Sequence, residues 1–536
     1  MEAIRQTKHI ASWSVWPVAL RCIGVIIAVE LFFTGLWVRQ QVWQACAQIH
    51  YQGDLEQAHR HGNRIIRAAI DSELGATQAT VPRWSSVFRA YLNYYDQIIA
   101  DRPDGQLELD YPPLRLLVMS MWSRLIYVPG LEVEDYDINL YAQPLLQLNI
   151  CAEILAAIAA FLLVRYWVAA EQPLGSKSDR PWMCGLAAAA LIWFDPALLV
   201  DAHGWPQWDA WVVPFYLFAA WTASTNRWFI AGLILAIGGA AKGQLWVTAP
   251  VLLLWPIFAW RWGGFLRILF GLAFGVACIQ AIWTLSIPSA QMWIGACAIA
   301  MFVVVAMLLT VSKLPLRAMA MACCVLLVGA IFFATVRYDA SFGWFKVGII
   351  YGASKNERHM FAGVTNNLPA ILTERYGWSS PNDNLTTITI HGSDYPITIG
   401  NLLQGMYGVS IVLCAAGLAM HSHRRSARTL LALAAPWVLF YALMPQMRER
   451  YLMWGGVISA IAIGVGLGPA LLHIVISLFA VDTILHIMMG VNPDSQSNWV
   501  YTLLQGMHPD SGWAVLLCAA IFLFWAVVPQ PQARHS

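Results

Sequence analysis

Residues 145–164 read LLQLNICAEILAAIAAFLLV, and this stretch decides the fold class. A predominantly apolar run of ~20 residues has the length that an α-helix needs to cross the hydrocarbon core of a membrane. We read the apolar run as extending from 139 to 165, and comparable runs recur along the chain. The sequence therefore predicts a polytopic membrane protein built from helices.

The composition agrees with a membrane location. Of the 536 residues, 59% are hydrophobic and 12% are charged, whereas a soluble domain has about 25% charged residues. The net charge of +2, without a long basic tract, argues against a nucleic-acid partner. Nearly all of the ten cysteines lie in apolar runs, and none has the spacing of a metal site.

Apolar run length predicts about 14 spans, so we expect an all-α bundle of about 12–14 transmembrane helices in one domain, 1–536. The run 17–37 is longer than a signal-peptide core and lacks a cleavage site, so we expect an uncleaved first span. The predicted spans are 17–37, 139–165, 182–200, 209–225, 228–241, 245–260, 265–285, 292–311, 318–336, 401–420, 429–445, 451–467, 469–488 and 512–528.

The positive charges predict the orientation of these spans. With the N-terminus inside, nearly every cytoplasmic connection is basic, as the positive-inside rule requires, and both termini are cytoplasmic. The basic residues concerned are Lys177, Arg180, Arg227, Arg261, Arg267, Lys313, Arg317, Arg424, Arg425, Arg428 and Arg534.

Two long segments, 38–138 and 337–400, then fall on the outer face. Within the first, apolar residues from Leu114 to Leu125 recur at helix spacing, with Arg115 and Arg124 between them. This pattern predicts an interfacial helix that lies along the membrane.

Two carboxylates in the first outer segment are candidate catalytic residues. Asp110 lies in Leu109-Asp-Tyr-Pro-Pro-Leu114, where the prolines restrict the backbone. Asp54 lies in Gly53-Asp-Leu-Glu-Gln-Ala-His-Arg-His61, close to His and Arg, and either carboxylate is a candidate general base. The alternatives are a rigid turn for the first motif and a solvated helix face for the second.

A second polar motif lies between two predicted spans, at Asp201-Ala-His203-Gly-Trp-Pro-Gln207-Trp-Asp209. Such groups at a membrane boundary usually face a cavity and function there. The alternative is an ordinary polar turn in which Asp209 caps a helix.

Two further motifs carry cations at the same predicted face. Lys242-Gly243-Gln244 supplies a cation that can meet a phosphate, unless the lysine only snorkels to the head groups. Arg448-Glu449-Arg450-Tyr451 places two guanidinium groups, which match phosphate geometry, around one carboxylate. The alternative for these four residues is an ion-pair cluster that satisfies itself.

Taken in order, these five motifs resemble those of the GT-C superfamily of membrane glycosyltransferases, which use polyprenyl- or dolichyl-phosphate sugars as donors. The likeness is to the lipid-linked-oligosaccharide glucosyltransferases of the endoplasmic reticulum and their bacterial relatives. The hexapeptide 109–114 matches the family motif residue for residue, the motif 201–209 is one residue longer, and Gly243 is an insertion. Arg448 stands where the family usually has His.

The resemblance implies a GT-C-like fold and inverting transfer of a sugar to an acceptor hydroxyl. It implies that Asp54 is the general base, with Asp110 as the rival. Donor and phosphate binding then fall to the residues of the remaining motifs: Asp201, His203, Gln207, Asp209, Lys242, Gln244, Arg448, Glu449, Arg450 and Tyr451. These residues require neither a metal nor a cofactor.

Two other classes stay open. A ligase or polymerase of surface glycans would also be an outer-face enzyme, and a transporter or flippase of a lipid-linked sugar would share the spans and buried charges. The expected partners are the bilayer, a polyprenyl-phosphate sugar and an acceptor that the sequence does not identify. The motif at 448–452 is closer to bacterial relatives, which favours a bacterial inner membrane.

Overall fold

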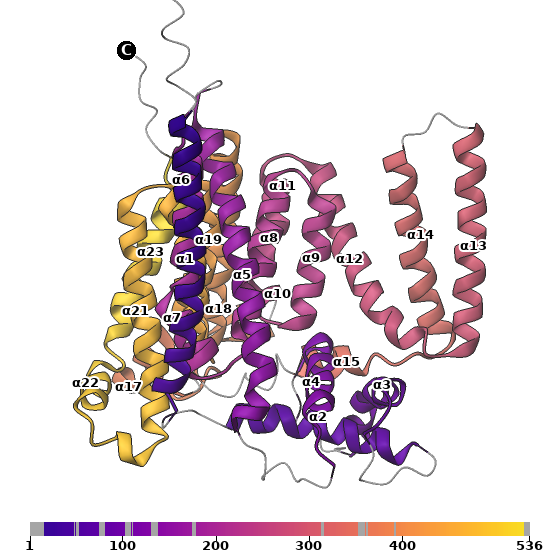
Figure 1. Cartoon of the computed structure of the whole chain (residues 1–536), viewed down its shortest axis with the longest axis horizontal. Coiled ribbons are helices and arrows are strands. Elements are labelled where there is room, and N and C mark those ends of the chain that lie inside the picture. Colours follow the sequence, from indigo (N-terminus) through magenta and orange to yellow (C-terminus); the bar gives the residue numbers. More distant parts are fainter. Residues whose placement is uncertain are drawn as a thin grey trace, which may run out of the picture.

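The computed structural model describes residues 15–47, 49, 53–73, 81–101, 109, 111–129, 138–173, 178–311, 316–351, 360, 363–390 and 393–529. These residues form an almost entirely helical molecule in which long helices stand side by side (Figure 1). The predicted all-α polytopic fold is confirmed.

Five helical segments of the described residues are long and apolar enough to cross a membrane, and α22 with α23 makes a sixth if that bent pair is one span. The five segments are α5 (Ile138–Glu171), α6 (Arg180–Trp193) continued through α7 (Pro196–Leu199) and the π-helical turn η2 (Val200–Gly204), α12 (Trp262–Thr284), α18 (Ile399–His423) and α21 (Leu467–Gly490). The bent pair is α22 (Trp499–Met507) and α23 (Ser511–Val527).

The other predicted runs also fall on helical elements, and some of these are broken. The elements are α1 (Val15–Ala45), η3 (Asp209–Trp211), α8 (Val212–Ser224), α9 (Trp228–Ala241), α10 (Leu245–Thr248), α11 (Pro250–Phe258), α13 (Pro288–Val311), α14 (Leu316–Arg337), α19 (Thr429–Leu443), η6 (Glu449–Tyr451), α20 (Leu452–Ser459) and η7 (Ala460–Gly464). The breaks before Pro196 and Pro250 have a local cause, because proline lacks the backbone N–H that continues a helix.

A second group of elements lies across one end of the bundle. In Figure 1, α2 (Gly53–Asp71), α3 (Trp84–Asp101), α4 (Pro113–Ile126) and α15 (Gly343–Phe345) lie below the long helices. The remaining elements are η4 (Lys346–Tyr351), α17 (Leu368–Tyr376), the antiparallel hairpin β1 (Asn384–Ile390) and β2 (Ser393–Thr398), and η8 (Pro493–Ser495). Both predicted outer segments contribute to this end, where α17 also lies.

The predicted interfacial helix is α4. Leu116, Met119 and Trp122 are buried on one side of it, while Met121 and Leu125 are 46% and 66% exposed on the other. The buried side packs on α2 and α3, which form a hydrophobic cluster with it. An exposed apolar side at this position suits contact with lipid.

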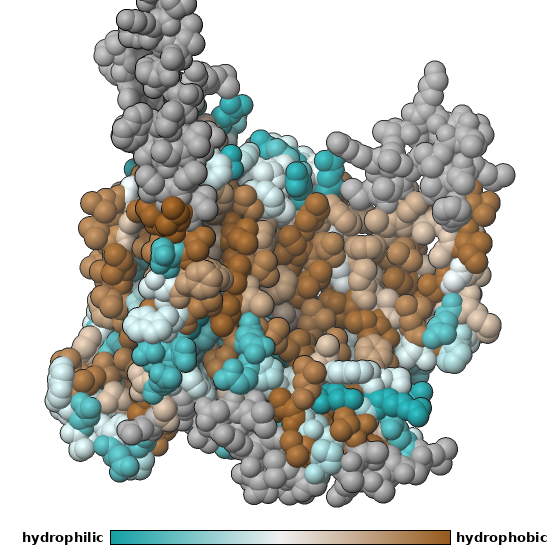
Figure 2. Space-filling view, viewed as in Figure 1, coloured by the Kyte–Doolittle hydropathy of each residue, from teal (hydrophilic) through white to brown (hydrophobic). Residues whose placement is uncertain are grey.

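The surface has the polarity that a membrane requires. Figure 2 shows apolar residues over the middle of the long helices and hydrophilic residues gathered mainly toward both ends. The start of α1 and the end of α23 lie at the same end of the bundle, opposite α2–α4 (Figure 1). This agrees with a path that begins and finishes on one side of the membrane, and which side is cytoplasmic stays a prediction.

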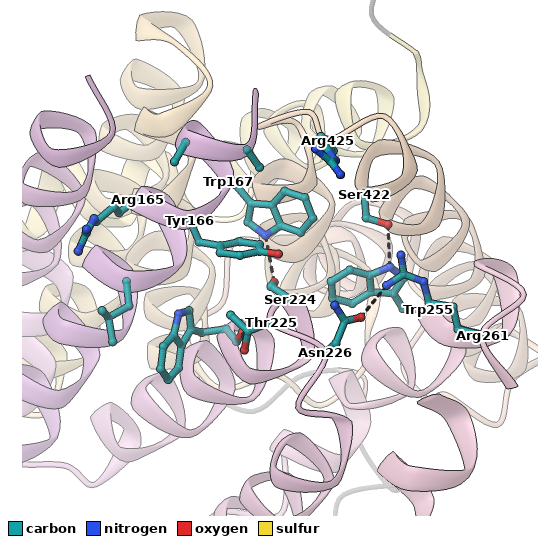
Figure 3. A pocket seen from close by; sticks show the side chains of 14 residues that line it. Arg165, Tyr166, Trp167, Ser224, Thr225, Asn226, Trp255, Arg261, Ser422 and Arg425 are labelled. Carbon is teal, nitrogen blue, oxygen red and sulfur yellow. Dashed lines mark hydrogen bonds between the residues drawn. The ribbon is translucent and has the colours of Figure 1, made fainter. Parts of the chain in front are cut away.

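A cavity of about 710 Å³ is present at that upper end, among the last turns of α5, α8, α11 and α18 (Figure 3). It lies far from α2–α4, because its lining residues on α5 lie at the end of that helix, whereas Ala142, Leu145 and Leu146 near the start of α5 pack with α2–α4.

Glycine allows the close contact between α9 and α12. A Cβ at Gly271 of α12 would overlap the carbonyl oxygen of Phe229, and a Cβ at Gly232 of α9 would overlap the carbonyl oxygen of Ile268. Small residues at helix interfaces let backbones approach closely, which drives helix association in lipid.

The change Gly271→Ala tests the close contact between α9 and α12, because a helix interior normally prefers alanine to glycine. In an unobstructed helix the change stabilises by about 0.5–1 kcal/mol, but at Gly271 we expect a loss of unfolding free energy because α9 and α12 must separate. The matched control is Gly295→Ala in α13, where nothing lies within 4 Å of the added Cβ. Steric trapping in bicelles measures both, and equal effects of the two changes would contradict the account.

Candidate functional site

Asp209 is the centre of a buried charge cluster at the lower end of the bundle. It starts η3, and its carboxylate pairs with Lys242 and, at 2.8 Å, with Nε of Arg450. Trp454 Nε1 donates to the backbone carbonyl of Asp209 at 2.8 Å. Asp209 is therefore held by ion pairs from two other segments and does not cap a helix with its side chain.

Lys242 is buried at the end of α9 rather than extended to the head groups. Burial lowers the pKa of Lys242 to about 8, and the neighbouring Asp209 opposes that shift. The snorkelling alternative is therefore wrong, because this ammonium group is directed at a buried carboxylate.

Arg450 links Asp209 to Glu449. Its Nη1 lies 3.1 Å from Glu449 Oε1, and Thr483 donates to the Glu449 backbone carbonyl at 2.7 Å. A Cβ at Gly363, where φ is +76°, would overlap the Glu449 carboxylate. The second outer segment thus reaches the cluster through a residue that must be glycine.

Aromatic rings form one wall of the cluster. Tyr451 and Trp454 stack with centroids 4.5 Å apart, and Lys242 Nζ lies 5.8 and 5.7 Å from the two centroids. Gln244 Nε2 donates to the Tyr451 hydroxyl at 3.3 Å. The Arg450 guanidinium lies 5.2 Å from the centroid of Trp205.

Arg115 connects the first outer segment to this site. Its guanidinium carbon lies 3.8 Å from the Tyr111 ring centroid and 4.1 Å from that of Trp208, which precedes Asp209. The Tyr95 hydroxyl donates to the Tyr111 carbonyl at 2.7 Å. The hexapeptide 109–114 therefore lies beside the motif 201–209, although no spacing in the sequence requires it.

The two candidate general bases are less fully described. Asp110 lies outside the described residues, between the buried Leu109 and Tyr111. Asp54 belongs to the first turn of α2, and its side chain also lies outside the described part. Near it on α2, His59 and His61 are buried, so this helix has a packed face as well as exposed residues.

Asp201 is the most unusual group in the site. It is fully buried in η2, and neither carboxylate oxygen has a hydrogen-bond partner among the described residues. A second carboxylate, that of Asp209, and the cations Arg450 and Lys242 lie near it. Leaving a buried acceptor without a donor costs about 1–3 kcal/mol, and more for a charged group.

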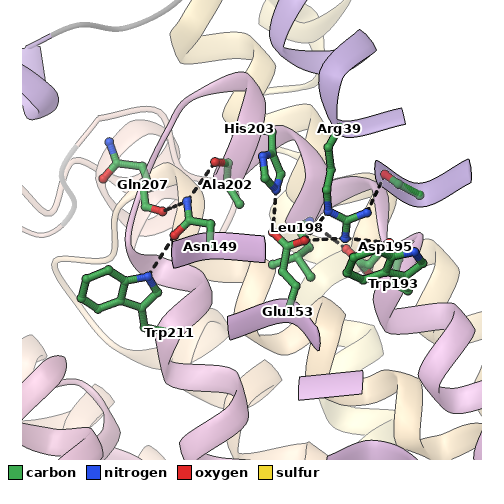
Figure 4. Close-up of polar contacts among 11 residues, drawn as sticks. Arg39, Asn149, Glu153, Trp193, Asp195, Leu198, Ala202, His203, Gln207 and Trp211 are labelled. Carbon is green, nitrogen blue, oxygen red and sulfur yellow. Dashed lines mark hydrogen bonds and ion pairs between the residues drawn. The ribbon is translucent and has the colours of Figure 1, made fainter. Parts of the chain in front are cut away.

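A second polar network holds the loop that carries Asp201 and Asp209 (Figure 4). His203 Nε2 lies 2.8 Å from Glu153 Oε1, and Arg39 Nε donates to Glu153 Oε2 at 2.5 Å. Arg39 also donates to the Trp193 carbonyl at 3.0 Å. His203 thus has a structural partner on α5 and contributes to the position of η2.

Asn149 of α5 holds the other end of the same loop. Its Nδ2 donates to the carbonyl oxygens of Ala202 and Gln207 at 2.9 and 2.8 Å, and its Oδ1 accepts from Trp211 at 2.9 Å (Figure 4). Sequence reasoning missed Asn149, Glu153 and Arg39. Asn149 and Glu153 did carry a signal, since both are polar side chains within the predicted span 139–165. Arg39 lies just after the predicted span 17–37, where nothing in the sequence distinguishes it from the other polar residues of the first outer segment.

The structure brings most of the predicted donor residues into this region and leaves one outside. Arg448 is exposed, one residue before the buried Glu449. The residues that lie together are Asp201, His203, Gln207, Asp209, Lys242, Gln244, Glu449, Arg450 and Tyr451.

Comparisons with known proteins do not add to this picture: no family model matches the chain, and no curated protein matches it. Within the described residues, no group of His, Cys, Asp and Glu side chains is arranged to hold a metal ion. That the reaction needs no metal stays a prediction.

The Glu153 network gives a direct stability test. Glu153→Gln leaves Arg39 buried without a charge partner, and breaking such a pair costs about 3–5 kcal/mol. The matched control is Glu171→Gln on the same helix, where the pair with Arg180 is 3.8 Å long and partly exposed, so we expect less than about 1 kcal/mol. Steric trapping measures both changes, and similar losses would show that the buried network does not hold the loop.

Proposed function

We propose that the protein is an inverting glycosyltransferase that moves a sugar from a polyprenyl-phosphate donor to an acceptor hydroxyl on the extracytoplasmic face. The observation that supports this most is Asp201, a buried carboxylate without a donor beside the cluster of Asp209, Lys242 and Arg450. A sugar hydroxyl is the kind of group that would donate to it. The GT-C-like order of the five motifs supports the same reaction class.

In the proposed reaction a carboxylate of the first outer segment is the general base. Asp54 or Asp110 takes the proton of the acceptor hydroxyl while that oxygen attacks the anomeric carbon. The bond from the anomeric carbon to the phosphate oxygen breaks, and its electron pair leaves with the lipid phosphate. Attack from the face opposite the phosphate inverts the anomeric centre, as in inverting glycoside chemistry with an alcohol in place of water.

The leaving phosphate needs stabilisation of negative charge rather than a proton. Lys242 is held in the site by Asp209, and Arg448, which is exposed and next to Glu449 in the chain, is a further cation that a bound donor phosphate could reach. Preorganised cations of this kind stabilise developing charge well because they do not need to reorganise during the reaction. Arg450 is already paired with Asp209 and Glu449, so its part is to hold the cluster together.

Changing the candidate bases tests the reaction. We expect Asp54→Asn or Asp110→Asn to lower turnover by about 10²–10⁴-fold, the usual contribution of a general base, while donor binding remains. The control is Asp71→Asn at the exposed end of the same helix as Asp54. Transfer is measured in proteoliposomes with a radiolabelled polyprenyl-phosphate sugar and an extract that contains acceptor glycans.

The same vesicles separate the alternatives. A transporter would move the labelled donor across the bilayer without forming product, and a ligase or polymerase would transfer a preassembled glycan instead of one sugar. If neither aspartate change slows turnover, the assignment of the base is wrong.

Asp201→Asn distinguishes a substrate-binding group from a structural one. Because the carboxylate has no partner to lose, we expect unfolding free energy to stay the same or rise, while the donor Kd increases at least about tenfold, equivalent to ~1.4 kcal/mol. The control is Asp195→Asn, because Asp195 accepts from Leu198 N at 2.9 Å and from Ser477 at 2.5 Å. That change should lower stability and leave the donor Kd unaltered; the reverse pattern would refute the role of Asp201.

A further inference from the structure

The cavity at the upper end of the bundle is independent of the site at Asp209. Its volume is about 710 Å³, within the ~300–1,000 Å³ that small-molecule sites usually have. Its walls come from the last turns of α5, α8, α11 and α18 and from the turns that follow them (Figure 3). A bare phosphate would fill only part of this space.

The lining has a strongly one-sided charge. Arg165, Arg261 and Arg425 line the cavity, and none of the described residues that line it is an aspartate or glutamate. Arginines are usually neutralised by carboxylates when they gather at one site, so this arrangement favours an anionic ligand. Planar guanidinium groups bind phosphate with two parallel hydrogen bonds, which a lysine cannot reproduce.

Within the described part of the chain, two of these arginines are positioned by neighbours that carry no charge. Arg165 lies over the Trp182 ring, 4.2 Å from its centroid, and Arg261 Nη1 donates to Asn226 Oδ1 at 2.7 Å. Both partners are neutral. Arg425 is exposed in the turn after α18, in a left-handed backbone conformation with φ of 53°.

Tryptophan side chains with hydrogen-bonded indole groups also line the cavity (Figure 3). Trp167 Nε1 donates to Ser224 at 3.0 Å, and Trp255 Nε1 donates to Ser422 at 3.1 Å. Because these indole groups already have partners, the charged donors that line the cavity are the three arginines. Tryptophan and arginine together at the end of apolar helices are typical of the membrane interface.

We propose that this cavity binds a phosphate group, either on the head group of an anionic lipid or as free phosphate. The position favours the lipid, since basic pockets between transmembrane helices on the cytoplasmic side bind anionic head groups. This end of the bundle is where the sequence places its basic connections. Occupation of the cavity would tie α5 and α18 together at the end opposite the proposed active site.

Binding of phosphatidylglycerol to the full-length protein in neutral detergent, followed by native mass spectrometry, tests the proposal. Phosphatidylcholine, whose head group has no net charge, is the comparison lipid. We expect the triple change Arg165→Gln, Arg261→Gln and Arg425→Gln to reduce phosphatidylglycerol binding by more than about tenfold, because it removes three charged donors to the phosphate. If the triple variant does not fold, the single change Arg425→Gln is used instead, because this position is exposed and lines the cavity. We expect it to reduce phosphatidylglycerol binding as well.

The matched control is Arg424→Gln, because Arg424 is also exposed but does not line the cavity. Inorganic phosphate distinguishes the two sources: competition at millimolar concentration indicates a site for free phosphate, and its failure to compete indicates a lipid. The proposal is overturned if phosphatidylglycerol and phosphate bind the arginine variants as they bind the native protein, or if Arg424→Gln reduces binding equally.

Discussion

The ion pairs of Asp209 are the constraint on which the rest of the site depends. Lys242 and Arg450 come from segments far apart in the sequence, and both are buried against this one carboxylate. Charges removed from water are tolerated only when they are paired with good geometry. The end of α9, which carries Lys242, and the turn η6, which carries Arg450, must therefore both meet η3. Aromatic residues surround the two ion pairs.

The sequence predicted the elements well because their cause is local. Apolar run length alone predicted α9 at its observed bounds and α12 and α21 to within a few residues, whereas α5 continues past the predicted end at 165 to Glu171. The helix breaks before Pro196 and Pro250 were missed, since both prolines lie within apolar runs that read as continuous. What could not be predicted was pairing across distance, such as Arg115 with Trp208 or Glu153 with His203. Those contacts depend on packing that no periodicity contains.

The candidate site was partly predictable for the same reason. A polar group at a membrane boundary is conspicuous in sequence, which identified the motif at 201–209 and Lys242. The roles of the residues within that motif could not be predicted. His203 holds the loop through Glu153, whereas Asp201 has no hydrogen-bond partner among the described residues. The two ends of the helix bundle therefore differ in charge. The lower end holds the cluster in which Asp209 is paired with Lys242 and Arg450, and the upper end holds the cavity lined by arginines.

We propose that Asp201 and Lys242 bind the sugar and the phosphate of a lipid-linked donor. An electron cryomicroscopy structure with a non-hydrolysable polyprenyl-phosphonate sugar tests it most directly. The account predicts phosphonate density within hydrogen-bond distance of Lys242 or Arg448 and a sugar hydroxyl that donates to Asp201. Density for the sugar at any other place, with Asp201 still without a donor, would contradict it.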